Sequence, residues 1–141
     1  MTTWWDHAVG KSAALTRVFT ADDHAAYVAL TGDDCAPGDR ALSDWAHDEV
    51  PEPLIAGLFS TLLGVHLPGH GTNYLKQSME FISPATIGEE VRATVEIIAV
   101  RPDKRLVDLE TTCVAGQRAI CRGQALVLAR GVSLTTPSGG A

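Results

Sequence analysis

The spacing of hydrophobic residues predicts helices in the first half of the chain. Thr20, with Asp23 three residues later, forms the pattern of a capping box, in which each side chain bonds a free backbone N–H of the other. A helix is therefore expected over residues 21–30, ending at Gly32. Four hydrophobic residues are expected on its inner face: Phe19, Ala26, Tyr27 and Leu30.

A second helix is predicted to begin near Pro53, a residue favoured in the first helical turn. Its body, LIAGLFSTLLGVHL at residues 54–67, is hydrophobic on every side. The run is shorter than the roughly 20 residues that a bilayer requires. Such a helix is expected to be buried and surrounded by protein on all sides.

The second half of the chain alternates hydrophobic and polar residues as strands do. Short turns at Pro84 and Gly116 favour an antiparallel meander. Four strand-like segments are present: residues 71–82, 89–100, 105–115 and 117–130. An antiparallel sheet must cover its hydrophobic face, and the apolar helix is the element able to cover it. We expect an α+β hot-dog fold, with a single domain over residues 1–133 and a flexible tail over residues 134–141.

Composition narrows the range of partners. The 141 residues are 45% hydrophobic and 20% charged with a net charge of −6, which argues against binding to nucleic acid. The three cysteines are an odd number without metal-ligand spacing, so we predict no metal and no cofactor. The first twelve residues lack the pattern of a signal peptide, so a cytoplasmic protein that does not bind membranes is expected.

One segment carries a resemblance to a known family. PLIAGLFSTLLGVHLPGHGTNYLKQSMEF, residues 53–81, resembles the central helix, Leu-Pro-Gly turn and glutamine-containing strand of MaoC-like (R)-specific enoyl-CoA hydratases. The likeness covers roughly residues 14–132. It implies the hot-dog fold and a thioester substrate carried by CoA or an acyl carrier protein. A hot-dog sheet leaves an edge strand exposed, so we also expect a homodimer with the pocket at the interface.

The catalytic motif of that family, D-x-N-P-x-H, is altered in this chain. The corresponding segment is LTGDDCAPGD, residues 30–39. Counting forward from Phe19 places Asp33 at the catalytic aspartate, whereas counting backward from Gly57 places Asp34 there and Asp39 at the histidine. Both alignments stay open, and neither supplies the histidine or the asparagine.

Several residues are candidates for the chemistry. The resemblance implies that the Gly57 amide lies in an oxyanion hole at the tip of the second helix, whose unpaired N–H groups would stabilise negative charge; the alternative is that Gly57 only permits close packing. Asp34 and Asp39 could form a pair whose pKa values are pushed apart, giving one acid and one base. The alternative is that both are solvated loop carboxylates. Leu58, Tyr74 and Gln77 are expected to bind substrate, although Gln77 could instead serve hydrogen bonding within the sheet.

Three functions fit this sequence. The first is an enoyl-thioester hydratase or 3-hydroxyacyl-thioester dehydratase with an altered acid–base set. The second is other thioester chemistry, such as hydrolysis, isomerisation or a cyclising conjugate addition. The third is a catalytically silent subunit of a hot-dog heteromer. The missing histidine favours the second and third, and the retained aspartates favour the first.

Overall fold

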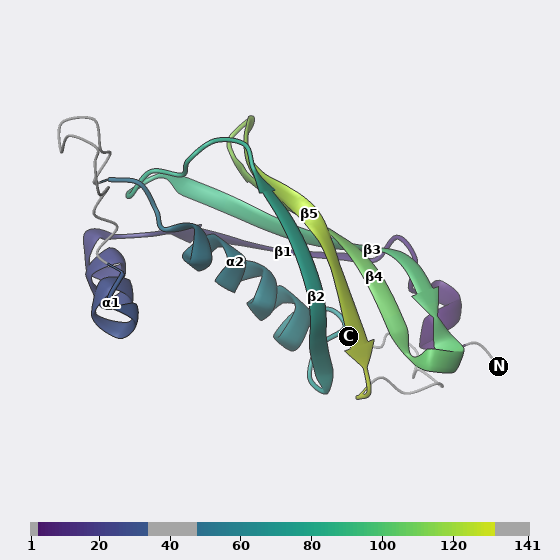
Figure 1. Ribbon diagram of the computed structural model, residues 1–141. Helices are drawn as coiled ribbons and strands as arrows, with labels where there is room; N and C mark the ends of the chain where they lie inside the picture. The colour runs from purple at the N-terminus through teal and green to yellow at the C-terminus, as the bar shows by residue number, and fades with distance from the viewer. Residues whose placement is uncertain (1–2, 34–47, 132–141) are drawn as a thin grey trace.

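The computed structural model describes residues 3–33 and 48–131. Its centre is a curved, fully antiparallel sheet with the strand order β1-β3-β4-β5-β2 (Figure 1). The strands are β1 (Ser12–Val18), β2 (Thr72–Phe81), β3 (Glu90–Arg101), β4 (Leu106–Ala115) and β5 (Arg118–Ala129). The predicted α+β hot-dog architecture is confirmed. The predicted tail, residues 134–141, lies outside the described residues.

Two features of the sheet differ from the sequence prediction. β1 was not predicted, because most of its short sequence, SAALTRV, is exposed and its alternation is weak. The predicted meander holds for β3, β4 and β5, but β2 pairs with β5 and not with β3. The connection between β2 and β3, residues 82–89, therefore carries the chain from one edge of the sheet to strand β3 near the other. We call this connection the crossing loop.

The helix α2 (Glu52–Thr61) lies against the concave face of the sheet (Figure 1) and continues as a π-helical turn, η3 (Leu62–His66). Its Ile55, Leu58 and Phe59 are buried in the core. The expectation that protein surrounds this helix on all sides is wrong for the single chain, because Gly57 is exposed and Val65 is 48% exposed. The sheet covers one side of the helix and leaves the other open.

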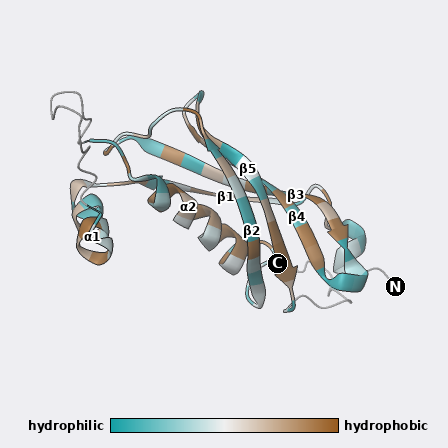
Figure 2. Cartoon of the chain, in the orientation of Figure 1, coloured by the Kyte–Doolittle hydropathy of each residue, from teal (hydrophilic) through white to brown (hydrophobic). Residues whose placement is uncertain are grey.

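The helix α1 (Ala21–Thr31) begins and ends where the sequence predicts. The Thr20 hydroxyl accepts from the Asp23 amide at 3.1 Å, the Asp23 carboxylate accepts from the Thr20 amide at 2.8 Å, and Gly32 closes the helix with φ of 75°. The predicted inner face is wrong within the helix, since no residue of α1 is buried and Leu30 is 86% exposed, whereas Phe19, just before the helix, is buried as expected. α1 projects from one end of the molecule, clear of the strands (Figure 1), and carries hydrophobic residues there (Figure 2).

Two cysteines lie inside the core, as the sequence predicts. Cys113 on β4 and Cys121 on β5 are opposite each other in the sheet, and both are free thiols. Burial raises the pKa of each thiol to about 11, so both stay protonated and unreactive at neutral pH. No helix in the described parts of the chain is long and apolar enough to cross a membrane.

Candidate functional site

The tip of α2 is formed by residues that precede Gly57. Pro51 is the N-cap, and the helix starts at Glu52, which makes Gly57 the sixth of its ten residues. In an α-helix the amide at that position donates to the carbonyl four residues earlier, so unpaired amides belong to the first turn. The tip consists of Glu52, Pro53 and Leu54, so Gly57 lies beyond the tip, and the place of its amide in an oxyanion hole stays a prediction.

Gly57 nevertheless lies on the open side of the helix. A Cβ added at Gly57 would meet no heavy atom within 4 Å. Close packing inside the chain therefore does not require glycine here, and the packing alternative has no support among the described residues.

Glu52 at the tip is a residue that the sequence reasoning left without a role. It is exposed and is the first residue of α2, and its charge contributes to the raised pKa of the Cys121 thiol on β5. Its position directly before Pro53 was the available signal, because proline marks the first helical turn. Glu52 brings a carboxylate to the helix tip.

The segment leading into α2 is held by the crossing loop. The Val50 amide donates to the Ala85 carbonyl at 2.7 Å, and the Ile87 amide donates to the Asp48 carbonyl at 2.5 Å. Glu49 and Thr86 form an isolated β-bridge between these bonds. The start of α2 is thus fixed to the sheet through backbone contacts.

The crossing loop is in turn held by Arg118, the first residue of β5. Its guanidinium donates to both carboxylate oxygens of Glu89, at 2.6 and 2.9 Å, and to the Pro84 carbonyl at 3.1 Å. This charged partner lowers the pKa of the Glu89 carboxyl. The Gly88 amide also donates to the Phe19 carbonyl at 2.8 Å, just before α1. One loop therefore anchors the chain before α1 and before α2.

Among the candidate aspartates, the structure places Asp33 and leaves two others outside its described residues. Asp33 follows the Gly32 cap of α1, and its carboxylate accepts from the Tyr27 hydroxyl at 2.9 Å. Its amide donates to the Thr31 hydroxyl at 3.1 Å. Asp34 and Asp39 lie outside the described residues, so their pairing stays a prediction.

Two of the predicted substrate-binding residues contact each other on β2. The Tyr74 hydroxyl donates to Oε1 of Gln77, and Nε2 of Gln77 donates to the Ser78 carbonyl at 2.7 Å and to the Thr111 hydroxyl at 3.0 Å. Gln77 thus serves hydrogen bonding within the sheet and also contacts Tyr74. Leu58 is 5% exposed within the core, so a contact between it and substrate stays a prediction. The candidate residues that the structure describes come from three places: Asp33 after the end of α1, Gly57 and Leu58 in the middle of α2, and Tyr74 and Gln77 on β2.

The described residues contain no group of three histidine, cysteine or acidic side chains able to hold a metal ion. A hollow lies over strands β2, β4 and β5, and most of its lining residues alternate with buried residues of these strands and so belong to the outer face of the sheet. Its lining residues are Ser78, Met79, Glu80, Glu110, Thr112, Arg122, Gly123 and Gln124. Tyr74 and Gln77, by contrast, lie on the concave side of the sheet with α2.

Comparison with known proteins gives a consistent result. No family model matches the chain. It is 41% identical over 107 residues to the (R)-specific enoyl-CoA hydratase of Aeromonas caviae, covering 73% of this chain and 80% of the relative. It is 33% identical over 125 residues to the (R)-specific enoyl-CoA hydratase of Rhodospirillum rubrum, covering 84% of this chain and 85% of that one.

A solved structure agrees in fold. The (R)-hydratase of A. caviae involved in PHA biosynthesis superposes with a TM-score of 0.75 at 39% identity, covering 84% of this chain and 94% of that structure. Sequence and structure therefore point to the same group of proteins.

Proposed function

Because the chain belongs to the MaoC-like family of (R)-specific enoyl-CoA hydratases, we propose that it adds water to an enoyl thioester or removes water from a 3-hydroxyacyl thioester. It is an enzyme of the hydro-lyase type. The thioester is carried by CoA or by an acyl carrier protein. The observation that carries the proposal is the 41% identity to a hydratase over most of both chains, together with the shared fold.

The reaction needs three groups. A base takes a proton from water while its oxygen bonds to C3, an acid gives a proton to C2, and a donor stabilises negative charge on the thioester oxygen. The tip of α2 is suited to the third role, because it has no side-chain cap hydrogen bond among the described residues and carries the positive end of the helix dipole. Pro53 offers no N–H there.

The acid and base are proposed to be aspartates of the segment after α1. Asp33, or Asp34 in the other alignment, takes the place of the family aspartate. In the second alignment Asp39 takes the place of the histidine, and two adjacent carboxylates would share a proton, with one pKa raised and the other low. This pair would supply both proton transfers without an imidazole.

A homodimer is proposed to complete the site. β2 is an edge of the sheet, and its neighbourhood exposes hydrophobic side chains such as Leu75 at 52% and Ile82 at 47%. An unpaired edge of this kind is a ready template for pairing with a second copy. The second copy would then face the open side of α2.

The altered motif supports two further candidates. Because residues 30–39 lack the histidine and asparagine of the family motif, the chain could act on thioesters by other chemistry or serve as a silent subunit beside an active partner. Release of free CoA without hydration would identify hydrolysis. No reaction from the pure chain, with activity restored by a partner subunit, would identify the silent role.

The acid–base proposal is tested with single aspartate variants in an assay of enoyl absorbance. Asp34→Asn and Asp39→Asn should each lower kcat by about 10²-fold or more if they form the pair, since general acid–base catalysis contributes about 10²–10⁴-fold. Asp33→Asn distinguishes the two alignments. Asp48→Asn is the matched control and should keep full activity, because only the backbone of Asp48 is used, in a bond to Ile87. Full turnover by either Asp34→Asn or Asp39→Asn would exclude the pair.

A further inference from the structure

The side-chain amide of Gln77 has one orientation. Its Nε2 lies 2.7 Å from the Ser78 carbonyl oxygen and 3.0 Å from the Thr111 hydroxyl. A carbonyl oxygen can only accept, so the atom facing it must be the amide nitrogen. Oε1 therefore faces Tyr74 and acts as the acceptor in that contact.

This orientation decides what the Tyr74 hydroxyl can do. Its proton is committed to Gln77. Burial also raises the pKa of Tyr74 to about 12, so the hydroxyl stays neutral at physiological pH. A phenol whose proton is committed still has a lone pair on its oxygen, so any further partner of Tyr74 must be a hydrogen-bond donor.

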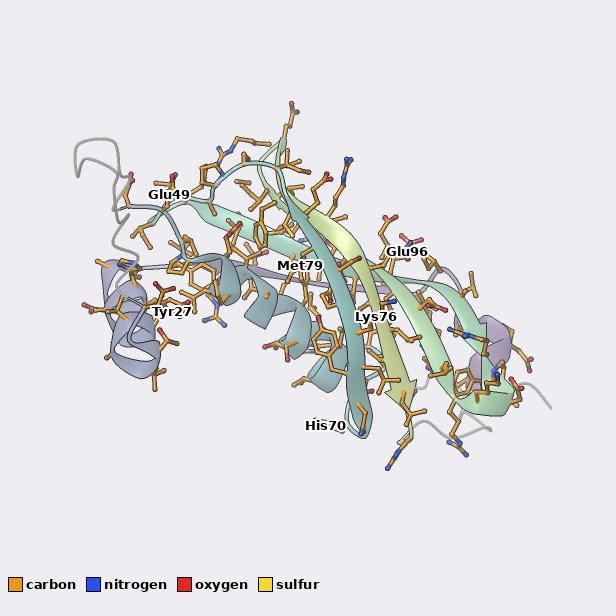
Figure 3. All side chains as sticks on the ribbon, viewed as in Figure 1. Tyr27, Glu49, His70, Lys76, Met79 and Glu96 are labelled. Carbon is orange, nitrogen blue, oxygen red and sulfur yellow. The ribbon has the colours of Figure 1, made fainter. Side chains whose placement is uncertain are left out.

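Tyr74 points to the side of the sheet where α2 lies. Tyr74 and Gln77 pair with Val127 and Ala125 of β5, whose side chains are buried in the core. Residues directly opposite each other in a sheet share a face. Tyr74 is nevertheless 41% exposed, and Met79 on the same face is 38% exposed. Figure 3 labels Met79 on this strand. The hydroxyl group thus lies on the concave side, at the edge that α2 leaves uncovered.

Thr111 explains how Gln77 is held. Within residues 3–33 and 48–131 it is the one fully buried residue with a polar side chain. A buried hydroxyl is costly unless it is hydrogen-bonded, and this one accepts from Gln77 across strand β5. Thr111 therefore acts on Tyr74 through Gln77.

We propose that the Tyr74 oxygen accepts a hydrogen bond from an N–H or O–H donor of the thioester substrate, with Gln77 and Thr111 as positioning residues. The inference rests on the proposed function, because it assumes a thioester on the concave side. Two parts of such a substrate carry donors: the amide N–H groups of the pantetheine arm and the hydroxyl of a 3-hydroxyacyl group. Pairing of β2 edges would leave this contact in place, since edge pairing uses backbone groups in the plane of the sheet while Tyr74 points out of that plane.

The test combines Tyr74→Phe with thioesters that differ in their donors. For crotonyl-CoA and the crotonyl thioester of N-acetylcysteamine, both with an amide N–H, Tyr74→Phe should raise KM about three- to tenfold with kcat unchanged. For crotonyl propyl thioester, which has no amide, the KM of the variant should be nearly equal to the KM of the wild type. If the donor is instead the 3-hydroxyl, the rise in KM appears with every 3-hydroxybutyryl thioester and with no crotonyl thioester. Equal KM values for the variant and the wild type with all these substrates would overturn the proposal.

The positioning role is tested at Thr111. Thr111→Val should raise the KM for crotonyl-CoA, but by less than Tyr74→Phe does. Thr111→Ser, which keeps the hydroxyl, should have the KM of the wild type. Thr112→Val is the matched control, because Thr112 is the next residue of β4, lines the outer hollow and should leave KM unchanged. A Thr111→Val effect that Thr111→Ser does not restore would mean a packing role only and would overturn the positioning assignment.

A binding measurement separates failure of this inference from failure of the proposed function. Butyryl-CoA has no double bond to hydrate but keeps both amide groups. Calorimetry should give a Kd about three- to tenfold weaker for Tyr74→Phe than for wild type, whether or not the wild type hydrates crotonyl-CoA. Hydration with equal butyryl-CoA Kd values excludes the pantetheine amides as the donor, and if KM for 3-hydroxybutyryl-CoA is also equal in variant and wild type, the role of Tyr74 alone is overturned. No binding of butyryl-CoA by the wild type overturns both.

Discussion

The two helices of this chain differ in what holds them in place. α2 lies on the sheet and buries Ile55, Leu58 and Phe59, so the hydrophobic core fixes its position. α1 buries none of its residues and depends on its two caps and on local bonds such as that from Tyr27 to Asp33. The part of the site on α2 and β2 is therefore built into the core, whereas the aspartates follow a helix that the core does not hold.

The largest expected contrast is between Phe59 and Leu30. Phe59→Ala should lower the free energy of unfolding by about 3–5 kcal/mol, because it leaves a cavity under α2. Leu30→Ala should change it by no more than about 0.5 kcal/mol, since the side chain is 86% exposed. Urea denaturation measures both. Equal losses in the free energy of unfolding would mean that α1 is buried against another surface in solution. If the effect of Leu30→Ala grows with protein concentration, that surface belongs to a second copy of the chain.

The N-cap of α1 gives the next largest effect. Thr20→Ala removes the acceptor for the Asp23 amide and should cost about 1 kcal/mol of helix stability. Because α1 does not pack on the core, this loss should be local: hydrogen exchange should become about fivefold faster in α1 and stay unchanged in α2. Equal acceleration in both helices would contradict the contrast between them.

A substitution at Gly57 tests whether a thioester or a second copy approaches the open side of α2. Gly57→Ala should stabilise the protein by about 0.5–1 kcal/mol, because alanine is the better helix former and its Cβ meets no atom of this chain. Hydration should nevertheless slow, if a thioester or a second copy approaches this face. Gly64→Ala is the matched control, since a Cβ there also meets nothing within 4 Å. Unchanged hydration by Gly57→Ala would remove Gly57 from the site.

The smallest effect concerns the ion pair between Arg118 and Glu89, which holds the crossing loop beside the segment that leads into α2. The pKa of Glu89 is lowered from about 4.5, chiefly by Arg118, so its contribution to stability is present above that value and is lost as the pH falls below it. Glu89→Gln should therefore be less stable than wild type at about pH 7, and this difference should shrink as the pH falls below about 4.5. Glu80→Gln, which breaks the more exposed pair with Arg122, should show a smaller change. A larger loss of stability from Glu80→Gln than from Glu89→Gln would mean that Arg118 does not hold the loop.

Local patterns predict most of the elements. The Thr20–Asp23 pair gives the start of α1, and alternation along residues 89–130 gives β3, β4 and β5 with their turns. These features depend on residues close in sequence. The position of β2 beside β5 could not be predicted in the same way, because it depends on which sheet edge the crossing loop reaches.

The candidate site is harder to predict from the sequence than the elements are, because it too depends on contacts between residues far apart in the chain. Gly57 was expected at the helix tip, whereas it is the sixth residue of a helix that starts at Glu52, within one residue of the predicted start near Pro53. The bond from Gln77 to Thr111 joins residues 34 positions apart across β5, so no local pattern reveals it. No residue of α1 is buried, which its hydrophobic spacing could not disclose.

The most direct measurement is the loss of enoyl absorbance when the purified chain alone is mixed with crotonyl-CoA. We expect saturable hydration, with 3-hydroxybutyryl-CoA formed in equal amount to the enoyl thioester lost, even though residues 30–39 contain no histidine. Absorbance that decays no faster than in buffer, or free CoA released in place of the hydroxy product, would contradict the proposed function.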